Sequence, residues 1–138
     1  LAAAMTGTEV VVSMVGPRID PMNLTEIPAS YDLFTTGTRN IIAAMKERGN
    51  RRLLVASSLG VEDEYPTTRP ATPDMRQNWL WNMRNVYQDM EDMEPIVRAS
   101  GLEYVIFRPG FLVDEPRRND LKLSIGTDSP KGRILTYA

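Results

Sequence analysis

The sequence predicts an α/β fold built on a parallel β-sheet. Residues 51–60 contain an apolar run without polar alternation, which is typical of a strand covered on both faces. Residues 9–15 are β-branched and apolar and end in a Gly-Pro turn, so they predict a second buried strand. Between them, residues 31–48 carry apolar side chains at helical spacing. This order with short connections predicts a right-handed βαβ unit with parallel strands.

The first predicted helix has signals for its start, its end and its packing. Ser30 is the expected N-cap of a helix over residues 31–48. Gly49 is expected to end the helix in a left-handed conformation. Gly37 lies inside the helix at a cost of about 1 kcal/mol relative to alanine. That cost predicts a close approach of the helix to a neighbouring strand or to a ligand.

A second helix and a third strand extend the pattern. Residues 76–99 carry one apolar stripe, and its methionines are expected to fill the core instead of binding a cofactor. Residues 102–107 predict the third strand, and residues 18–29 and 61–73 predict loops rich in proline. Weaker strand patterns occupy residues 121–125 and 133–137, around a turn at residues 126–128.

The amino-acid composition excludes several classes of function. The 138 residues suffice for about one domain with a sizeable core. A net charge of −2 without a basic run argues against nucleic-acid binding. The chain has no cysteine and no histidine, which excludes disulfides, thiolate or histidine metal sites and His-dependent triads. No apolar run approaches the roughly 20 residues that span a bilayer.

A candidate site follows from where the hydroxyl side chains lie. Ser57 and Ser58 come directly after the apolar run of the second strand, and Ser13 ends the first strand in the same way. Ligands of open α/β sheets bind beyond the carboxyl ends of the strands. We therefore expect any site to lie at this edge of the sheet.

Four segments in fixed order resemble one protein family. They are EVVVSMVG at residues 9–16, TGTRNIIAAMKERG at residues 36–49, RLLVASSLG at residues 52–60 and RASGLEYVIFRPG at residues 98–110. Together they resemble the atypical short-chain dehydrogenase/reductases of the NAD(P)H-binding, NmrA-like and biliverdin-reductase-B-like branch. The resemblance implies a Rossmann-type doubly wound parallel sheet and a nicotinamide dinucleotide cofactor, with NADPH expected before NADH.

The chain also departs from the family pattern. The family opens with a strand, a glycine-rich turn and a helix that hold the pyrophosphate, and nothing in this sequence matches that fingerprint. The chain corresponds to the family's strands four to seven, so we expect a single partial domain over residues 1–138. We expect a piece of a longer protein before a short protein with a partner, because half a sheet would expose an apolar edge at residues 10–15.

The resemblance assigns roles to residues at the strand ends. The residues expected to bind the cofactor are Ser13, Val15, Gly16, Pro17, Ser57, Arg108, Pro109, Gly110 and Phe111. Ser57 and Ser58 are the expected catalytic residues, since a hydroxyl can polarise the carbonyl that accepts the hydride. The alternatives are a tight turn without a ligand after the first strand, and serines that only satisfy backbone groups at the strand ends. No metal site is expected.

The tyrosine–lysine pair of many short-chain dehydrogenases is absent. Met90 stands at the lysine position, and Tyr87 is one residue out of register with Glu91 four residues beyond it. A carboxylate would raise the tyrosine pKa, whereas the lysine lowers it. Glu94 matches a glutamate of the family on this helix.

Three functions therefore remain open from the sequence. The first is an atypical NAD(P)H-dependent oxidoreductase that transfers a hydride to a small organic acceptor. The second is a protein that binds or senses the dinucleotide without turnover, and the third is a structural subunit of a larger complex. A small-molecule substrate, no nucleic acid and a cytoplasmic location are the accompanying expectations.

Overall fold

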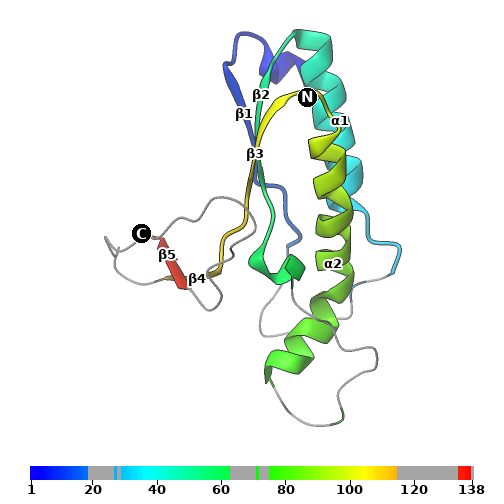
Figure 1. The fold of residues 1–138 in the computed structure, drawn as a ribbon, viewed down its shortest axis with the longest axis vertical. Helices are drawn as coiled ribbons and strands as arrows, with labels where there is room; N and C mark the ends of the chain where they lie inside the picture. The colour runs from blue at the N-terminus through cyan, green and yellow to red at the C-terminus, as the bar shows by residue number, and fades with distance from the viewer. Residues whose placement is uncertain (19–26, 28, 63–70, 72–74, 115–133, 138) are drawn as a thin grey trace.

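A computed structural model describes residues 1–18, 27, 29–62, 71, 75–114 and 134–137 (Figure 1). The elements in chain order are η1 (Ala2–Met5), β1 (Val10–Ser13), α1 (Leu33–Arg48), β2 (Arg52–Ala56), η2 (Leu59–Glu62), α2 (Met75–Arg98), β3 (Glu103–Phe107), β4 (Phe111–Asp114) and β5 (Ile134–Tyr137). A helix thus separates β1 from β2 and another separates β2 from β3, and each returns the chain to the start of the sheet.

The first three strands form a parallel sheet in the order β1-β2-β3. Val12 lies opposite Leu54, and Leu54 lies opposite Val105. The predicted βαβ unit and the predicted third strand are confirmed. β4 and β5 form a separate parallel pair in which Phe111 lies opposite Ile134.

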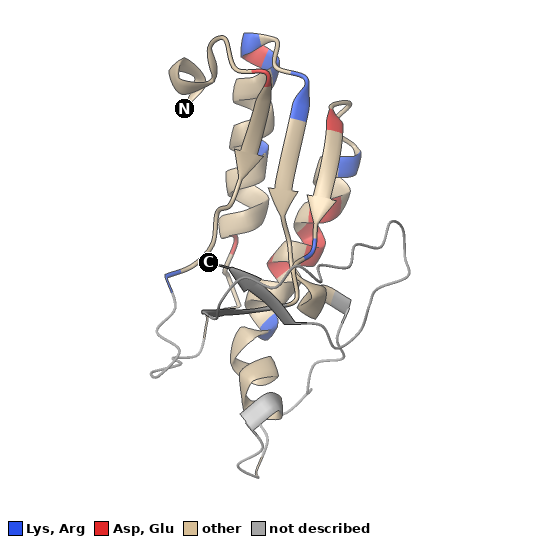
Figure 2. Ribbon diagram, turned by 90° about the vertical axis from the view of Figure 1, so that its left-hand side faces the viewer, with Lys and Arg blue, Asp and Glu red and all other residues tan. Residues whose placement is uncertain are grey.

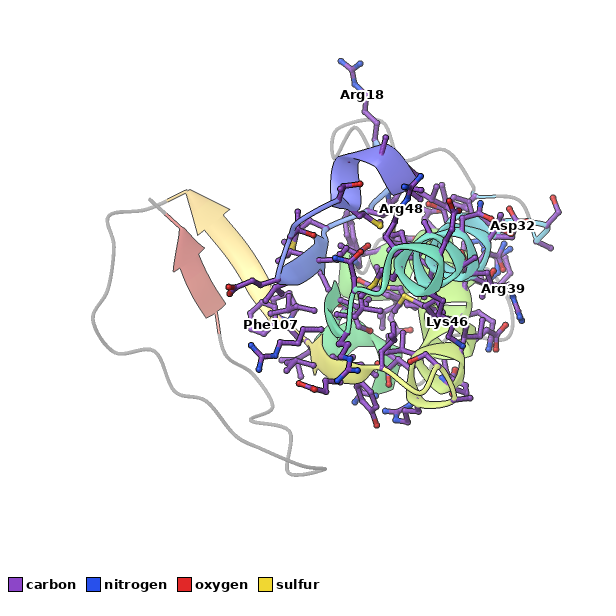
Figure 3. The ribbon with its side chains drawn as sticks, turned by 90° about the horizontal axis from the view of Figure 1, so that it is seen from above. Arg18, Asp32, Arg39, Lys46, Arg48 and Phe107 are labelled. Atoms are coloured by element: carbon purple, nitrogen blue, oxygen red, sulfur yellow. The ribbon has the colours of Figure 1, made fainter. Side chains whose placement is uncertain are left out.

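Both helices lie on the same face of the three-stranded sheet (Figure 2). Leu53 and Val55 point to that face and are buried, because β-strand side chains alternate between the two sides of a sheet. The rest of the core comes mainly from one stripe on each helix: Phe34, Ile41, Ile42 and Met45 from α1, and Met83, Val86, Met93 and Val97 from α2. The prediction that the methionines fill the core is therefore confirmed. Seen from above, Figure 3 shows Arg39 and Lys46 on the side of α1 that adjoins α2.

The opposite face of the sheet is open in the described part of the chain. Val12 and Val105 are 57% and 56% exposed and flank the half-buried Leu54 in one row across the strands. Beside them, Arg52 and Glu103 form an exposed ion pair of 3.1 Å between neighbouring strands. The apolar run of β2 predicts cover on both faces, but the described residues cover one face only. At the β1 edge of the described sheet, Val10 and Val12 are exposed.

The start of α1 differs from the prediction. Asp32, and not Ser30, is the N-cap residue, and its side chain makes no capping hydrogen bond. Instead, the buried Asp89 carboxylate of α2 accepts the backbone N–H groups of Phe34 and Thr35, at 2.7 and 3.1 Å. The helix starts where a carboxylate from another helix can satisfy its first free donors.

Of the two glycine predictions on α1, the one for Gly49 is confirmed, and the close approach of a strand at Gly37 is wrong. Gly49 ends α1 at φ 75° and donates its N–H to the carbonyls of Lys46 and Met45, as expected for a left-handed C-cap. A Cβ built at Gly37 would meet no atom of the described residues within 4 Å, so no described strand approaches the helix closely there. The missing side chain at Gly37 therefore has no packing reason there.

The remaining differences concern the loops and the last strands. The loop predicted over residues 61–73 begins within η2, and most of the rest lies outside the described residues. β5 confirms most of the weak strand predicted over residues 133–137, whereas residues 121–128 lie outside the described part. β4 was missed because it has only four residues and follows a Pro-Gly turn directly. Among the described residues, no helix combines the length and the apolar character that a bilayer span requires.

Candidate functional site

The chain leaves β1, β2 and β3 at one edge of the sheet. Because the three strands are parallel neighbours, residues 14–17, 57–60 and 108–110 follow their carboxyl ends in the same order. We call these segments the β1 exit, the β2 exit and the β3 exit. The residues predicted to bind a cofactor, except Phe111, therefore lie at this edge or at the strand end next to it.

Two backbone hydrogen bonds join the β2 exit to the β3 strand and its exit. The Ser57 N–H donates to the Phe107 carbonyl at 2.8 Å, and the Leu59 N–H donates to the Pro109 carbonyl at 3.1 Å. These bonds continue the strand pairing past the last paired residues, Ala56 and Phe107. The two exits are consequently fixed relative to each other.

A buried carboxylate from α2 lies behind these two exits. Glu94 is 2% exposed, and its Oε1 accepts the Ser57 hydroxyl at 2.9 Å and the Arg108 Nε at 2.7 Å. Its Oε2 accepts Nη2 groups of Arg98 and Arg108, both at 2.7 Å. Arg108 thus binds Glu94 with two parallel N–H groups, the strongest geometry for this kind of pair. We call Glu94, Ser57, Arg98 and Arg108 the Glu94 cluster.

The partners of Glu94 keep its carboxylate ionised. Burial by itself raises the pKa of Glu94, because a charge is less stable away from water. The hydrogen bonds from Arg108, Arg98 and Ser57, together with the charge of Arg108, outweigh that effect and hold the pKa below its ordinary value. The partners in the cluster therefore compensate the cost of burying the Glu94 charge.

The two predicted catalytic serines have different surroundings. The Ser57 hydroxyl is buried and donates to Glu94. The Ser58 side chain is half-buried, and its Oγ accepts the Gly60 N–H at 3.1 Å in the turn that starts η2. The Ser58 carbonyl accepts the Val61 N–H at 3.2 Å. Within the described part of the chain, the Ser58 hydroxyl accepts a hydrogen bond and donates none.

Tyr87 is the neighbour of the β2 exit that sequence reasoning did not assign. A Cβ added at Gly60 would lie 2.7 Å from the Tyr87 ring, so the ring packs directly on the glycine backbone. The Tyr87 hydroxyl accepts the Trp79 indole N–H at 3.1 Å. Met90, at the lysine position of the family's pair, packs against the core. The bare Gly60 between Leu59 and Val61 is the sequence signal that could have indicated a ring at this place.

The β1 exit is more exposed than the other two. Ser13 is buried, whereas Val15 and Gly16 are exposed and Pro17 is half-buried. A Cβ at Gly16 would meet no atom of the described residues within 4 Å, so these residues leave its backbone open to an approaching group. Phe111 lies in β4, and its side chain is outside the described part.

Two further observations concern metal binding and a groove outside the candidate site. The described residues contain no group of three or more acidic side chains placed to hold a metal ion. A shallow groove of about 550 Å³ lies between α1 and α2, bordered by Arg39, Lys46, Pro95 and Ser100. Ser100 precedes β3, so this groove lies toward the amino ends of the strands, away from the three exits.

Comparisons with known proteins agree with this fold. A family model described as NAD(P)H-binding matches residues 1–136. A Bacillus halodurans structure, provisionally assigned as an NAD-dependent epimerase/dehydratase, superposes with a TM-score of 0.66 at 22% identity and covers 98% of this chain. A Veillonella parvula short-chain dehydrogenase/reductase, solved in complex with NADP, gives a TM-score of 0.55 at 21% identity over 86% of this chain.

These likenesses support the fold, and the matched structures are longer than this chain. The chain spans 55% of the Bacillus structure and 45% of the Veillonella structure, or about half of each. A comparison with curated proteins gives no match. The Rossmann-type α/β fold expected from the sequence is confirmed by the parallel sheet and by these structures. The chain belongs to the NAD(P)H-binding family.

Proposed function

We propose that this chain contributes the nicotinamide-facing strand ends of an NAD(P)H-dependent oxidoreductase of the atypical short-chain dehydrogenase type. The reaction is hydride transfer to the carbonyl of a small organic acceptor, with NADPH as the expected cofactor. The observation that carries the proposal is the different hydrogen bonding of the two serines. The Ser57 hydroxyl donates to Glu94, whereas the Ser58 hydroxyl accepts the Gly60 N–H and donates to none of the described residues.

The residues at this edge suit the nicotinamide end of the cofactor. Glu94 carries one negative charge and its partners Arg98 and Arg108 carry two positive charges, so the cluster behind the exits adds no excess negative charge beside an uncharged carboxamide and ribose. Gly16 leaves its backbone open, and Pro109 and Gly110 follow β3 at the same edge. These three residues would hold the nicotinamide end through backbone groups. When bound, the reduced cofactor supplies the hydride.

Ser58 is the residue assigned to the acceptor. Its Oγ already accepts the Gly60 N–H, which orients the hydroxyl and leaves its proton for donation. A hydrogen bond from this hydroxyl to a carbonyl oxygen stabilises the negative charge that develops there when the carbon takes a hydride. Ser57 takes no direct part in this proposal, because its proton is bonded to Glu94.

A second candidate is a dinucleotide-binding protein without turnover. The observation that favours it is the state of Tyr87, whose hydroxyl accepts the Trp79 indole N–H and which has Glu91 four residues later. The lysine of the family's tyrosine–lysine pair is thus replaced by Glu91 at that spacing. A catalyst without this pair depends more strongly on Ser58.

The test begins with titration of the protein by NADPH and NADH, followed through dihydronicotinamide fluorescence. We expect saturable binding, tighter for NADPH. Cofactor consumption is then measured with a panel of small aldehydes and ketones. Ser58→Ala should retain NADPH binding and lose about 100-fold in turnover, the usual scale for one proton donor. The matched control is Ser30→Ala, which removes an exposed hydroxyl from the segment before α1.

The outcomes separate the candidates. If neither dinucleotide binds, the proposed function is wrong in both forms. Binding without consumption of any acceptor favours the protein without turnover. Unchanged turnover in Ser58→Ala removes the role assigned to that hydroxyl.

A further inference from the structure

The Glu94 cluster differs from a surface ion pair in its burial and in the number of donors that bind one carboxylate. The two carboxylate oxygens of Glu94 receive four donor groups, at 2.7 to 2.9 Å, and the side chain is 3% exposed. A buried charge is tolerated only when its hydrogen-bonding capacity is satisfied in this way. With two donors on each oxygen, Glu94 has no capacity left to bind a ligand or to take up a proton from one. Its role must therefore act through its partners.

Two of those partners begin the strand exits. Ser57 is the first residue after β2, and Arg108 is the first residue after β3. The same two exits are joined by the backbone bonds from Ser57 to Phe107 and from Leu59 to Pro109. One carboxylate on α2 is thus linked by side chains to both segments at the candidate site. The Arg108 fork also fixes orientation, because its two N–H groups must face the two oxygens together.

Arg98 provides an internal comparison. It donates to Glu94 Oε2 at 2.7 Å, the same distance as Arg108 Nη2. However, Arg98 belongs to α2 itself, four residues after Glu94, and its side chain is 50% exposed. Removing Arg98 deprives Glu94 of one charged partner but leaves in place the side-chain hydrogen bonds from Ser57 and Arg108.

We propose that Glu94 is a positioning residue, which sets the placement of the β2 and β3 exits through Ser57 and Arg108. The dinucleotide part of this inference rests on the proposed function, since the exits are where the nicotinamide end would bind. In this role Glu94 touches neither cofactor nor acceptor. It fixes the backbone that carries Ser58 on one exit and Pro109 and Gly110 on the other.

The test is amide hydrogen exchange of the protein with Glu94→Gln, which keeps the shape of the side chain and removes its charge. We expect exchange at the Ser57 and Leu59 amides to rise at least tenfold more than exchange at Met45, a buried residue of α1 that reports overall stability. The NADPH Kd should rise at least fivefold. Arg108→Gln should act in the same direction. Arg98→Gln and the exposed Glu91→Gln should leave the ratio of the two exchange rates within threefold of the starting protein.

A milder variant guards against a failure to fold. Ser57→Ala removes one uncharged donor and leaves the ion pairs intact, so the protein should fold while Ser57 and Leu59 exchange rises about threefold relative to Met45. An equal rise at all three amides in both variants would overturn the inference, because it would make Glu94 a general stabiliser only. Selective exchange with an unchanged NADPH Kd would overturn its link to the cofactor. Selective exchange in a protein that binds no dinucleotide supports the placement of the exits and removes the proposed function alone.

Discussion

At the scale of single residues, the β2 exit depends on Gly60 having no side chain. The Tyr87 ring lies so close that a Cβ at Gly60 would come within 2.7 and 2.8 Å of two of its carbons. Contacts this short require the ring or the backbone to move. The ring is also held by the hydrogen bond that its hydroxyl accepts from Trp79. Gly60 therefore couples the turn at Ser58 to α2.

We expect Gly60→Ala to destabilise the protein by about 1–3 kcal/mol, the usual range for overpacking a filled site. In a chain that already carries Tyr87→Ala, the additional loss caused by Gly60→Ala should be much smaller, because the added methyl group then enters the space that the ring leaves. Urea unfolding of the two single variants and the double variant measures the coupling. Additive losses would show that the methyl group and the ring do not meet.

At the scale of elements, the structure of α1 depends on a residue of α2. The first turn of a helix has free N–H groups, which a local N-cap side chain ordinarily accepts. In α1 the Asp32 carboxylate instead accepts the Thr36 hydroxyl at 3.0 Å, and Asp89 takes the backbone donors of Phe34 and Thr35. The negative charge of Asp89 also lies at the positive end of the helix dipole. Packing of α2 against α1 therefore supplies the acceptor for the first turn of α1.

We expect Asp89→Asn to lower the free energy of unfolding by about 1–2 kcal/mol, since the amide keeps one acceptor and loses the charge at the helix end. Asp92→Asn, at an exposed position on the same helix, is the matched control and should change little. Chemical denaturation followed by circular dichroism gives both values. Equal effects of the two substitutions would contradict the capping role.

At the scale of the whole molecule, acid stability should follow the Glu94 cluster. The cluster joins α2, β2 and β3, so its charge state affects the packing of one helix on two strands. Its partners hold the pKa of Glu94 below the ordinary value of 4.5. A carboxyl with a lowered folded pKa contributes stability that is present above its unfolded pKa and is lost as the pH falls through the folded value.

We therefore expect the stability difference between the starting protein and Glu94→Gln to be constant above about pH 5.5 and to shrink as the pH falls below 4.5. At neutral pH the difference should be about 2–3 kcal/mol, because two arginines lose their charged partner while keeping partial access to water. Urea unfolding from pH 7 to pH 3 measures it. A difference that does not vary with pH would show that the charge of Glu94 is not what stabilises the fold.

The sequence by itself determined the order of the main elements and the parallel pairing of the first two strands. Apolar runs at residues 10–13 and 52–56, the helical spacing between them and Gly49 are local signals, and local signals suffice to place strands and helices. They also placed the candidate site, because parallel strands bring their carboxyl ends together.

Only the tertiary structure decided which side chains satisfy which buried groups. Ser57 meets Glu94 across 37 positions of the chain, and Phe34 meets Asp89 across 55. The neighbouring residues Ser57 and Ser58 thus have different partners, and Asp89, instead of the predicted N-cap Ser30, accepts the first backbone N–H groups of α1. The physical reason is that a buried polar group takes the donor or acceptor that packing brings within about 3 Å, wherever that group stands in the sequence.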